Sequence, residues 1–326
     1  MKVLYIGGTG EISQACVAQS IEIGHQVTLF NRGQRSETIP DTVDRVVGDL
    51  RDGDVYAGLA KRDFDVVCQF LAFDTATVQR DIDLFSGHCQ QYVFISTASA
   101  YQKPPNGHVV TEATPLENPF WAYSRHKAAC ESLLAESLDR LPATSVRPSH
   151  TYRTRFPSPV IDGDHLAWRI LNDKPVLVHD AGESLWTVTH SEDFARAFTK
   201  LLGRVEAVGS AYHITNDVAQ SWNDIVDAVG ETLERRPVIQ QVPTDTLVGY
   251  KPEWEGPLLG DKSNSMQFDN SRIRSVIGPW ECKISLQDGL DLVSAHVDAR
   301  LSAGYMPDRT LDELVDRIVA DQLGKQ

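Results

Sequence analysis

Tyr123 and Lys127 stand four residues apart in a stretch, Trp121 to about Leu138, that is predicted to be helical. Four residues make about one helical turn, so both side chains are expected on one face. An ammonium beside a phenol favours the phenolate and would lower a pKa that starts near ~10. Such a tyrosine can exchange a proton with a substrate hydroxyl near neutral pH. With the Thr97 hydroxyl at a predicted strand end, these residues are predicted as a catalytic set, although the Tyr/Lys spacing also occurs on exposed helix faces.

A glycine-rich turn at the start of the chain is the second chemical feature. The apolar run at residues 2–6 leads directly into Gly7-Gly8-Thr9-Gly10, and a helix is predicted from Glu11. Glycine allows a sharp turn and a close approach of the backbone to a pyrophosphate, and the helix N-terminus favours the same negative charge. Ser13 stands where a third glycine is expected, and we interpret this small residue as tolerated. We predict a dinucleotide site at this turn, with Gly7, Gly10, Glu11 and Ile12 as cofactor-binding residues.

The end of the next predicted strand, residues 26–30, bears on the choice of cofactor. Asn31-Arg32 follows it, with Arg35 close behind and no acidic residue. An acidic residue at this position usually binds the adenosine ribose of NAD, whereas a nearby arginine accommodates the 2′-phosphate of NADP. Asn31 and Arg32 are therefore predicted to contact the cofactor, NAD(P), with a preference for NADP. The alternative is that both arginines lie solvated on a polar loop.

The elements that position these residues alternate between strand and helix. This rhythm predicts an α/β protein with a Rossmann, doubly wound parallel sheet, whose ligands lie beyond the carboxyl ends of the strands. Asp49, Leu50, Leu71 and Ala72 lie at such strand ends and are predicted to contact the cofactor. The predicted strands are 2–6, 26–30, 45–48, 65–70, 91–95 and 141–147, and the predicted helices are 11–23, 55–62, 75–88 and 121–138.

After Pro148 the rhythm changes to short strands and small helices. We interpret this half as a smaller C-terminal α/β lobe that binds substrate. The predicted division assigns 1–150, with 184–212 returning to it, to the NAD(P)-binding Rossmann domain, and 151–183 with 213–326 to the substrate lobe.

Charge and cysteine usage exclude several classes of function. The 31 Lys and Arg against 45 Asp and Glu give a formal net charge of −14, which argues against a nucleic-acid partner. The five cysteines show no metal or redox spacing, so no metal site is predicted and free thiols in a reducing, cytoplasmic compartment are expected. No apolar run approaches ~18 residues and the chain starts directly with a strand, so neither a membrane span nor a signal peptide is expected.

Taken together, these motifs resemble the extended short-chain dehydrogenase/reductase superfamily, in its NAD(P)-dependent epimerase/dehydratase group. The similar segments are GGTGEIS at Gly7, DLRD at Asp49, LAF at Leu71, ISTASAY around Thr97, YSRHK at Tyr123, VRPSHTY at Val146 and SLWTVTHSEDFARAF at Ser184. The resemblance implies a Rossmann domain for NAD(P), a C-terminal lobe for a substrate that is often a nucleotide sugar, and a possible homodimer through the helix at 121–138. Lys127 is then expected also to anchor the nicotinamide ribose.

Departures from that family's pattern bear on the substrate. Ala98-Ser99 follow Thr97 where 4,6-dehydratases carry Asp-Glu, so dehydration is not expected. His150 replaces a frequent Asn, and Trp186 replaces an arginine that often contacts a diphosphate, which weakens the nucleotide-sugar interpretation. Ser99, His150 and Trp186 are predicted to line the substrate site, although His150 could instead hydrogen-bond backbone and Trp186 could be core packing.

Two functions follow from these observations. The first is an NAD(P)-dependent epimerase or reductase acting on a hydroxyl or keto carbon of a sugar-like or nucleotide-linked small molecule. The second is a non-catalytic NAD(P)-binding sensor or an RNA-associated scaffold, because the same segments resemble the atypical branch that contains chloroplast stem-loop RNA-binding proteins. That branch often lacks the Tyr/Lys pair, which this chain keeps.

Overall fold

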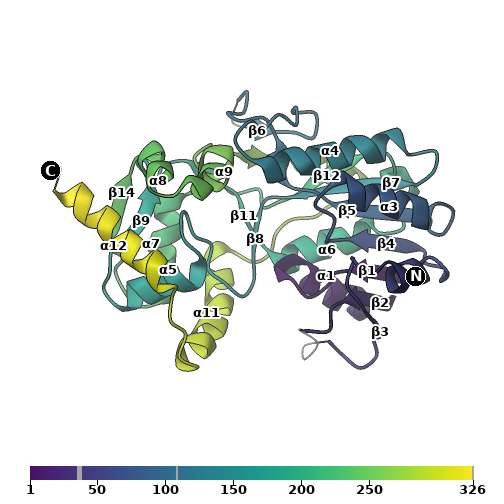
Figure 1. Ribbon diagram of the computed structural model, residues 1–326, viewed down its shortest axis with the longest axis horizontal. Helices are drawn as coiled ribbons and strands as arrows, with labels where there is room; N and C mark the ends of the chain where they lie inside the picture. The colour runs from purple at the N-terminus through teal and green to yellow at the C-terminus, as the bar shows by residue number, and fades with distance from the viewer. Residues whose placement is uncertain (35–38, 108, 325–326) are drawn as a thin grey trace.

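A seven-stranded parallel sheet, built from strands between residues 2 and 214, organises the first lobe of the chain (Figure 1). The computed structural model describes residues 1–34, 39–107 and 109–324. Across the sheet the strand order is β12-β7-β5-β4-β1-β2-β3. The predicted doubly wound parallel sheet is confirmed. Its strands are β1 (Lys2–Ile6), β2 (Gln26–Asn31), β3 (Asp44–Val47), β4 (Val66–Gln69), β5 (Gln91–Ile95), β7 (Ala143–Pro148) and β12 (Ala211–Ile214).

The central strands are apolar because both faces of the sheet are covered. All four residues of β4 and all five of β5 are buried, as expected for a parallel sheet between two helical layers. The chain first builds outward through β2 and β3, then returns to the other side of β1 with β4. This reversal leaves a crevice beyond the carboxyl ends of β1 and β4, where α/β sheets bind ligands.

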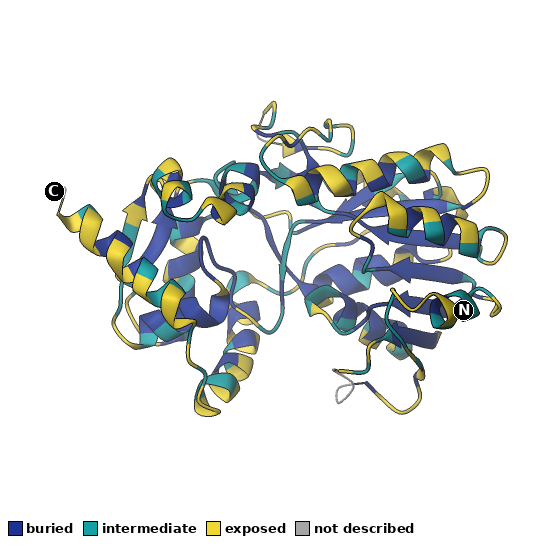
Figure 2. Ribbon diagram, viewed as in Figure 1, coloured by how far each residue is buried: buried dark blue, intermediate teal, exposed yellow. Residues whose placement is uncertain are grey.

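Helices cover the sheet on both faces, and their buried sides turn toward it (Figure 2). One layer contributes Ala15, Cys16 and Phe194 to the core, and the other contributes Tyr56, Ile82 and Leu134. The first layer comprises α1 (Glu11–Glu22), α6 (Ser191–Leu201) and α10 (Ser271–Ile277); the second comprises α2 (Gly53–Leu59), α3 (Thr75–Phe85) and α4 (Ala122–Glu136).

A second lobe with its own hydrophobic core lies beside the sheet (Figure 1). Its main elements are α5 (Gly163–Leu171), β9 (Val176–His179), α7 (Trp222–Thr232), β14 (Ile239–Val242), α8 (Thr244–Tyr250), α11 (Leu286–Ser302) and α12 (Arg309–Leu323). Short paired strands connect the two lobes or extend the second: β6 (Val109–Val110) with β15 (Gln267–Phe268), β8 (His150–Tyr152) with β11 (Val188–His190), and β10 (Leu185–Trp186) with β13 (Gln220–Ser221). Single turns complete the fold: η1 (Ala98–Ala100), η2 (Val205–Ala207), η3 (Pro252–Trp254), α9 (Glu255–Pro257) and the π-helical η4 (Leu258–Lys262).

The predicted domain division stays a prediction. Helix α10, which falls in the span 213–326, packs against α6 and β12 of the sheet lobe. Within the described residues, no helix is both long and apolar enough to cross a membrane.

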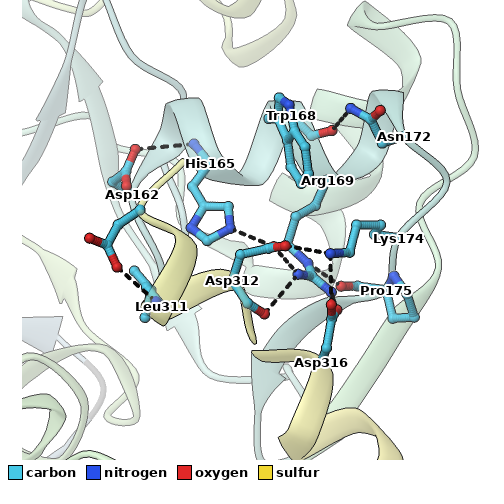
Figure 3. Close-up of polar contacts among 11 residues, drawn as sticks. Asp162, His165, Trp168, Arg169, Asn172, Lys174, Pro175, Leu311, Asp312 and Asp316 are labelled. Carbon is cyan, nitrogen blue, oxygen red and sulfur yellow. Dashed lines mark hydrogen bonds and ion pairs between the residues drawn. The ribbon is translucent and has the colours of Figure 1, made fainter. Parts of the chain in front are cut away.

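A network of buried charge attaches the last helix to the second lobe (Figure 3). Arg169 of α5 is 0% exposed, and its Nε donates to the carbonyl of Pro175 at 2.7 Å. Its guanidinium pairs with Asp312 and, at 2.7 Å, with Asp316, both on α12. His165 adds a 3.0 Å contact to Asp312. Helix α12 is therefore held by a buried cation between two carboxylates rather than by apolar packing alone.

Candidate active site

A cleft of about 890 Å³ follows the carboxyl ends of the sheet strands. We call it the main cleft. It brings together almost all the residues predicted from the sequence to bind a cofactor or act in catalysis. Those that line it are Gly7, Gly10, Glu11, Ile12, Asn31, Arg32, Asp49, Leu50, Leu71, Thr97, Tyr123 and Lys127.

The glycine turn has the backbone that a phosphate cradle requires. Gly7 and Gly8 have φ of +109° and +97°, conformations that other residues rarely adopt. A Cβ on Gly8 would lie 2.0 Å from the Leu29 side chain, so this position also has no space for one. Ser13 accepts a 3.0 Å hydrogen bond from the Gly10 N–H, so the residue in the third-glycine position supports the turn. The turn and the N-terminus of α1 fit a dinucleotide pyrophosphate.

Two of the predicted cofactor residues have other contacts. The Glu11 carboxylate accepts hydrogen bonds from the Thr154 backbone N–H, at 2.9 Å, and from its hydroxyl. Ala72 does not line the cleft and is buried; its carbonyl accepts a hydrogen bond from Lys127. Both residues therefore hold the walls of the cleft in place in this structure.

The far end of the cleft, beyond β2 and β3, carries charge. Arg32 is exposed and makes no hydrogen bond or ion pair with any residue the structure describes. Arg51, in contrast, pairs with Asp49 at 2.9 Å, and its hydrogen bonds hold the Asp49 pKa well below the ordinary value. Arg35 lies outside the described residues. Of the two arginines lining this end, Arg32 is the one available to a ligand.

Lys127 is fixed at the base of the cleft. Its Nζ donates to the carbonyls of Ala72 at 2.7 Å and Ile95 at 2.6 Å. It also lies 4.7 Å from the centre of the Phe73 ring. Burial lowers the Lys127 pKa to about 8. An ammonium has three donors, so the third remains for a ligand in the cleft.

The pKa of Tyr123 differs from the sequence expectation. Burial raises this pKa, a hydrogen bond with Thr97 lowers it, and the nearby Asp261 charge raises it; the net shift is upward. Lys127 Nζ lies 6.0 Å from the Tyr123 ring centre and donates instead to two carbonyls. The expected lowering by Lys127 is therefore not present in the structure, because burial of the phenol dominates.

A smaller cavity of about 330 Å³ opens beside Thr97 and Tyr123, which it shares with the main cleft. We call it the inner cavity. It contains all three predicted substrate residues: Ser99, His150 and Trp186. Residues from the sheet lobe form one side, and Trp186 and Asp261 come from later in the chain. Thr97 and Tyr123 thus lie where the two cavities meet.

The three predicted substrate residues differ in surroundings. The Ser99 hydroxyl lies 3.0 Å from that of Thr97 and 2.7 Å from that of Ser124, so it orients the threonine. Burial and then the Lys262 charge lower the His150 pKa to about 3, so this ring is neutral. Trp186 is 1% exposed and stacks on Trp222 with ring centres 6.3 Å apart. Trp186 therefore serves core packing as well as forming the cavity wall.

Asp261 is the charged residue lining the inner cavity that was not predicted from the sequence. It lies on the π-helical turn η4, a form frequent at functional sites. Burial raises its pKa to about 6, against the lowering effect of Lys103, whose Nζ is 3.7 Å away. No local pattern marks it, because it reaches the cavity only through tertiary packing. Trp121, Ser149 and Thr151 also line the inner cavity and were missed, although Trp121 is close to Tyr123 in sequence.

The position of Asp261 is fixed relative to the Thr97 segment. Asn118 Nδ2 donates to the carbonyls of both Ser99 and Gly260, each at 2.6 Å. A Cβ on Gly256 would lie 2.3 Å from the Trp121 ring, so this turn requires glycine to pack against the indole. The carboxylate is therefore held at a set place beside Tyr123.

We predict that Asp261→Asn lowers the pKa of Tyr123, because a negative charge that opposes the phenolate is removed. Thr97→Val should raise it, because a hydrogen bond that stabilises the phenolate is lost. Tyrosinate absorbance during a pH titration measures both, with Tyr123→Phe subtracted to isolate the one phenol. The same Tyr123 pKa in the wild type and in Asp261→Asn would show that the Asp261 charge does not act on this phenol.

Among the described residues, no group of three or more His, Cys, Asp or Glu side chains is arranged to hold a metal ion. The polar groups nearest the place where the two cavities meet are the Thr97 hydroxyl, the Tyr123 phenol, the Lys127 ammonium and the Asp261 carboxylate.

Known proteins are similar to this chain, some in sequence and others in fold. The chain is 26% identical to the chloroplast stem-loop binding protein of 41 kDa b of Arabidopsis thaliana, over 77% of this chain. The match covers 66% of that protein, which is just under two thirds of its length. It is 26% identical to 2'-dehydrokanamycin reductase of Streptomyces kanamyceticus, over 72% of this chain and 67% of that one. The structure of UDP-glucuronic acid 4-epimerase from Bacillus cereus in complex with NAD superposes with a TM-score of 0.75 at 18% identity, covering 94% of this chain and 99% of that one.

The sequence profile of one family matches residues 3–215, which include the glycine turn, Thr97, Tyr123 and Lys127. The resemblance inferred from the motifs is confirmed, and this chain belongs to the NAD dependent epimerase/dehydratase family.

Proposed function

We propose that the protein is an NAD(P)-dependent epimerase or reductase that acts on a hydroxyl or keto carbon of a sugar-like or nucleotide-linked small molecule. The observation that carries this proposal is the position of Thr97 and Tyr123 where the main cleft and the inner cavity meet. A cofactor bound in the main cleft and a substrate bound in the inner cavity would have their reacting atoms next to each other, beside these two side chains. The family match supports NAD(P) binding.

Each side chain has a separate role in this proposal. When bound, the nicotinamide supplies or accepts the hydride. Tyr123 gives a proton to, or takes one from, the substrate oxygen, and its raised pKa means that it begins as the neutral phenol, ready to donate to a carbonyl oxygen. Thr97, oriented by Ser99, holds the same oxygen. Lys127 offers its third N–H to the ribose, while two carbonyls hold it.

The inner cavity supports a substrate with a ring and hydroxyl groups. Trp121, Trp186 and Tyr123 supply flat apolar walls, and the Asp261 carboxylate supplies an acceptor for hydroxyl or amino hydrogens. Two of the similar proteins have names that concern such molecules, a reductase of 2'-dehydrokanamycin and a UDP-glucuronic acid epimerase.

One experiment separates epimerase from reductase. The nucleotide released from the purified protein by denaturation is identified, and turnover is then measured with a panel of nucleotide sugars and free keto sugars. An epimerase is expected to release tightly held cofactor and to show no net cofactor oxidation. A reductase is expected to consume one NAD(P)H for each carbonyl reduced. A protein that releases no nucleotide on denaturation and does not bind added NAD(P)H would contradict the proposal.

We predict that Arg32→Ala weakens NADPH binding by roughly 10- to 100-fold, the scale of a lost hydrogen bond to a charged group, while NADH binding changes little. Arg51→Ala is the matched control, since that guanidinium is already paired with Asp49. Fluorescence titration of both cofactors measures this. An equal loss for NADH and NADPH in Arg32→Ala would remove the basis for an NADP preference.

The alternative is a non-catalytic NAD(P)-binding sensor or RNA-associated scaffold. The similarity to the chloroplast stem-loop binding protein favours it. Cofactor binding without turnover on any panel substrate, together with specific RNA binding, would support this alternative.

A further inference from the structure

A third cavity, of about 580 Å³, shares no lining residue with the main cleft or the inner cavity. We call it the outer pocket. Helices α1 and α6, which lie side by side (Figure 1), form two of its walls, and the segment from α10 onward forms the third. Its lining residues are Gln19, Ile23, Arg196, Thr199, Lys200, Arg274, Pro279, Trp280, Glu281 and Lys283.

Hydrogen bonds hold two of its walls in place, α6 and the segment that begins with α10. The Asp193 carboxylate on α6, which is 0% exposed, accepts from the backbone N–H groups of Lys283 at 3.0 Å and Ile284 at 2.9 Å. Arg274 Nε donates to the carbonyl of Trp280 at 2.8 Å. The segment that carries Trp280 and Lys283 is therefore fixed against α6 in this structure.

The charge of the pocket is opposite to that of the protein as a whole. Four of its side chains are cationic, whereas the chain has a net charge of −14. Arg196 and Arg274 pair with Asp193 and Asp217, and Glu281 also lies in the lining. The ammonium groups of Lys200 and Lys283 make no hydrogen bond or ion pair with any described residue. Counting all seven charged groups, four cations against three anions leave one positive charge.

The aromatic wall adds a second kind of contact. Trp280 is 8% exposed, so its ring is fixed against the hydrophobic core while it forms part of the pocket. Its indole Nε1 has no hydrogen-bond acceptor among the described residues. The small part of the indole that reaches the pocket lies beside the cations, so its fluorescence can report on an anionic ligand bound there.

We propose that the outer pocket binds a small phosphate-bearing molecule. Its phosphate oxygens accept from the ammonium groups of Lys200 and Lys283 and from guanidinium N–H groups not used in the ion pairs. A concave site of this size holds a small molecule. A nucleic acid would instead bring many phosphates against the net charge of −14.

The test is calorimetric titration with pyrophosphate, carried out both without NADPH and with NADPH added, so that binding in the main cleft can be distinguished from binding in the outer pocket. The double variant Lys200→Glu/Lys283→Glu is expected to weaken binding by roughly 30-fold or more, as two charge contacts are lost and reversed. The control, Lys61→Glu/Arg236→Glu, makes the same change in net charge at exposed sites outside the pocket. It is expected to change the affinity by less than about threefold, because salt screens charges that lie far from the ligand. Equal weakening in the two double variants, or none in either, would overturn the proposal.

Intrinsic fluorescence gives an independent readout. Pyrophosphate and ATP are expected to change the emission of the wild type but not of Trp280→Phe, which should still bind pyrophosphate by calorimetry. A single-stranded RNA oligonucleotide that binds at the same lysines more tightly than either probe would overturn the small-molecule assignment. None of these measurements depends on turnover, so failure here leaves the proposed enzymatic function unaffected.

Discussion

Tyr123→Phe is expected to lower turnover by roughly 10²- to 10⁴-fold, the scale of lost acid–base assistance, while cofactor affinity stays the same. The substitution removes only the hydroxyl that lies where the main cleft and the inner cavity meet. Phenylalanine keeps the ring between Trp121 and Phe73, so the walls of the site remain. Steady-state turnover with the substrate found in the panel, and fluorescence titration of the cofactor, measure the two quantities separately.

Tyr305→Phe serves as the matched control, because it removes one tyrosine hydroxyl from a residue that lines neither cavity. Its turnover is expected to equal that of the wild type. Full activity of Tyr123→Phe would show that another group moves the proton. Loss of cofactor binding together with turnover would show that the hydroxyl serves binding rather than proton transfer.

Arg169→Met is expected to destabilise the fold by about 3–5 kcal/mol, the usual cost of removing one partner from a buried ion pair. The guanidinium is fully buried between Asp312 and Asp316, and its removal leaves these carboxylates with Lys174 alone as a cationic partner (Figure 3). Urea denaturation followed by circular dichroism measures the change in the free energy of unfolding.

Arg309→Met is the matched control on the same helix. Arg309 pairs with Glu313 at 2.7 Å but is 90% exposed, so its loss is expected to change stability by less than about 0.5 kcal/mol. Equal effects of the two variants would show that burial of Arg169 does not govern the strength of this contact.

The same network predicts an acid dependence of stability. Burial opposes ionisation of Asp312, but hydrogen bonds from His165 and Lys174 and the Arg169 charge hold its pKa at about 2, below the ordinary value of 3.8. A carboxyl group whose pKa is lowered by folding stabilises the protein above its unfolded pKa, and this contribution disappears as the pH falls toward the folded pKa. Wild-type stability is therefore expected to fall between about pH 4 and pH 2, and Arg169→Met should show a weaker dependence in that range.

Local sequence accounts for most of the fold and for the main cleft. The alternation of apolar runs with helical stretches determined the parallel sheet, because a strand between two helical layers must be apolar on both faces. The glycine turn, the strand ends at Asn31, Asp49 and Leu71, and the Tyr123–Lys127 spacing could be identified because each is a contiguous pattern. Parallel strands place their carboxyl ends at one edge, so these separate patterns were predicted to converge there.

Only the tertiary structure decided what surrounds the reacting groups. The pKa of Tyr123 is raised because burial outweighs the expected help from Lys127, and burial is a property of the packed chain. Asp261 reaches the inner cavity through a π-helical turn held by Asn118, and no pattern near either residue indicates that contact. Short-range spacing in the sequence thus determined the helices, the strands and the cofactor end of the site. The pKa of Tyr123 and the lining of the inner cavity depend instead on contacts between distant segments, which exist only once both lobes have packed.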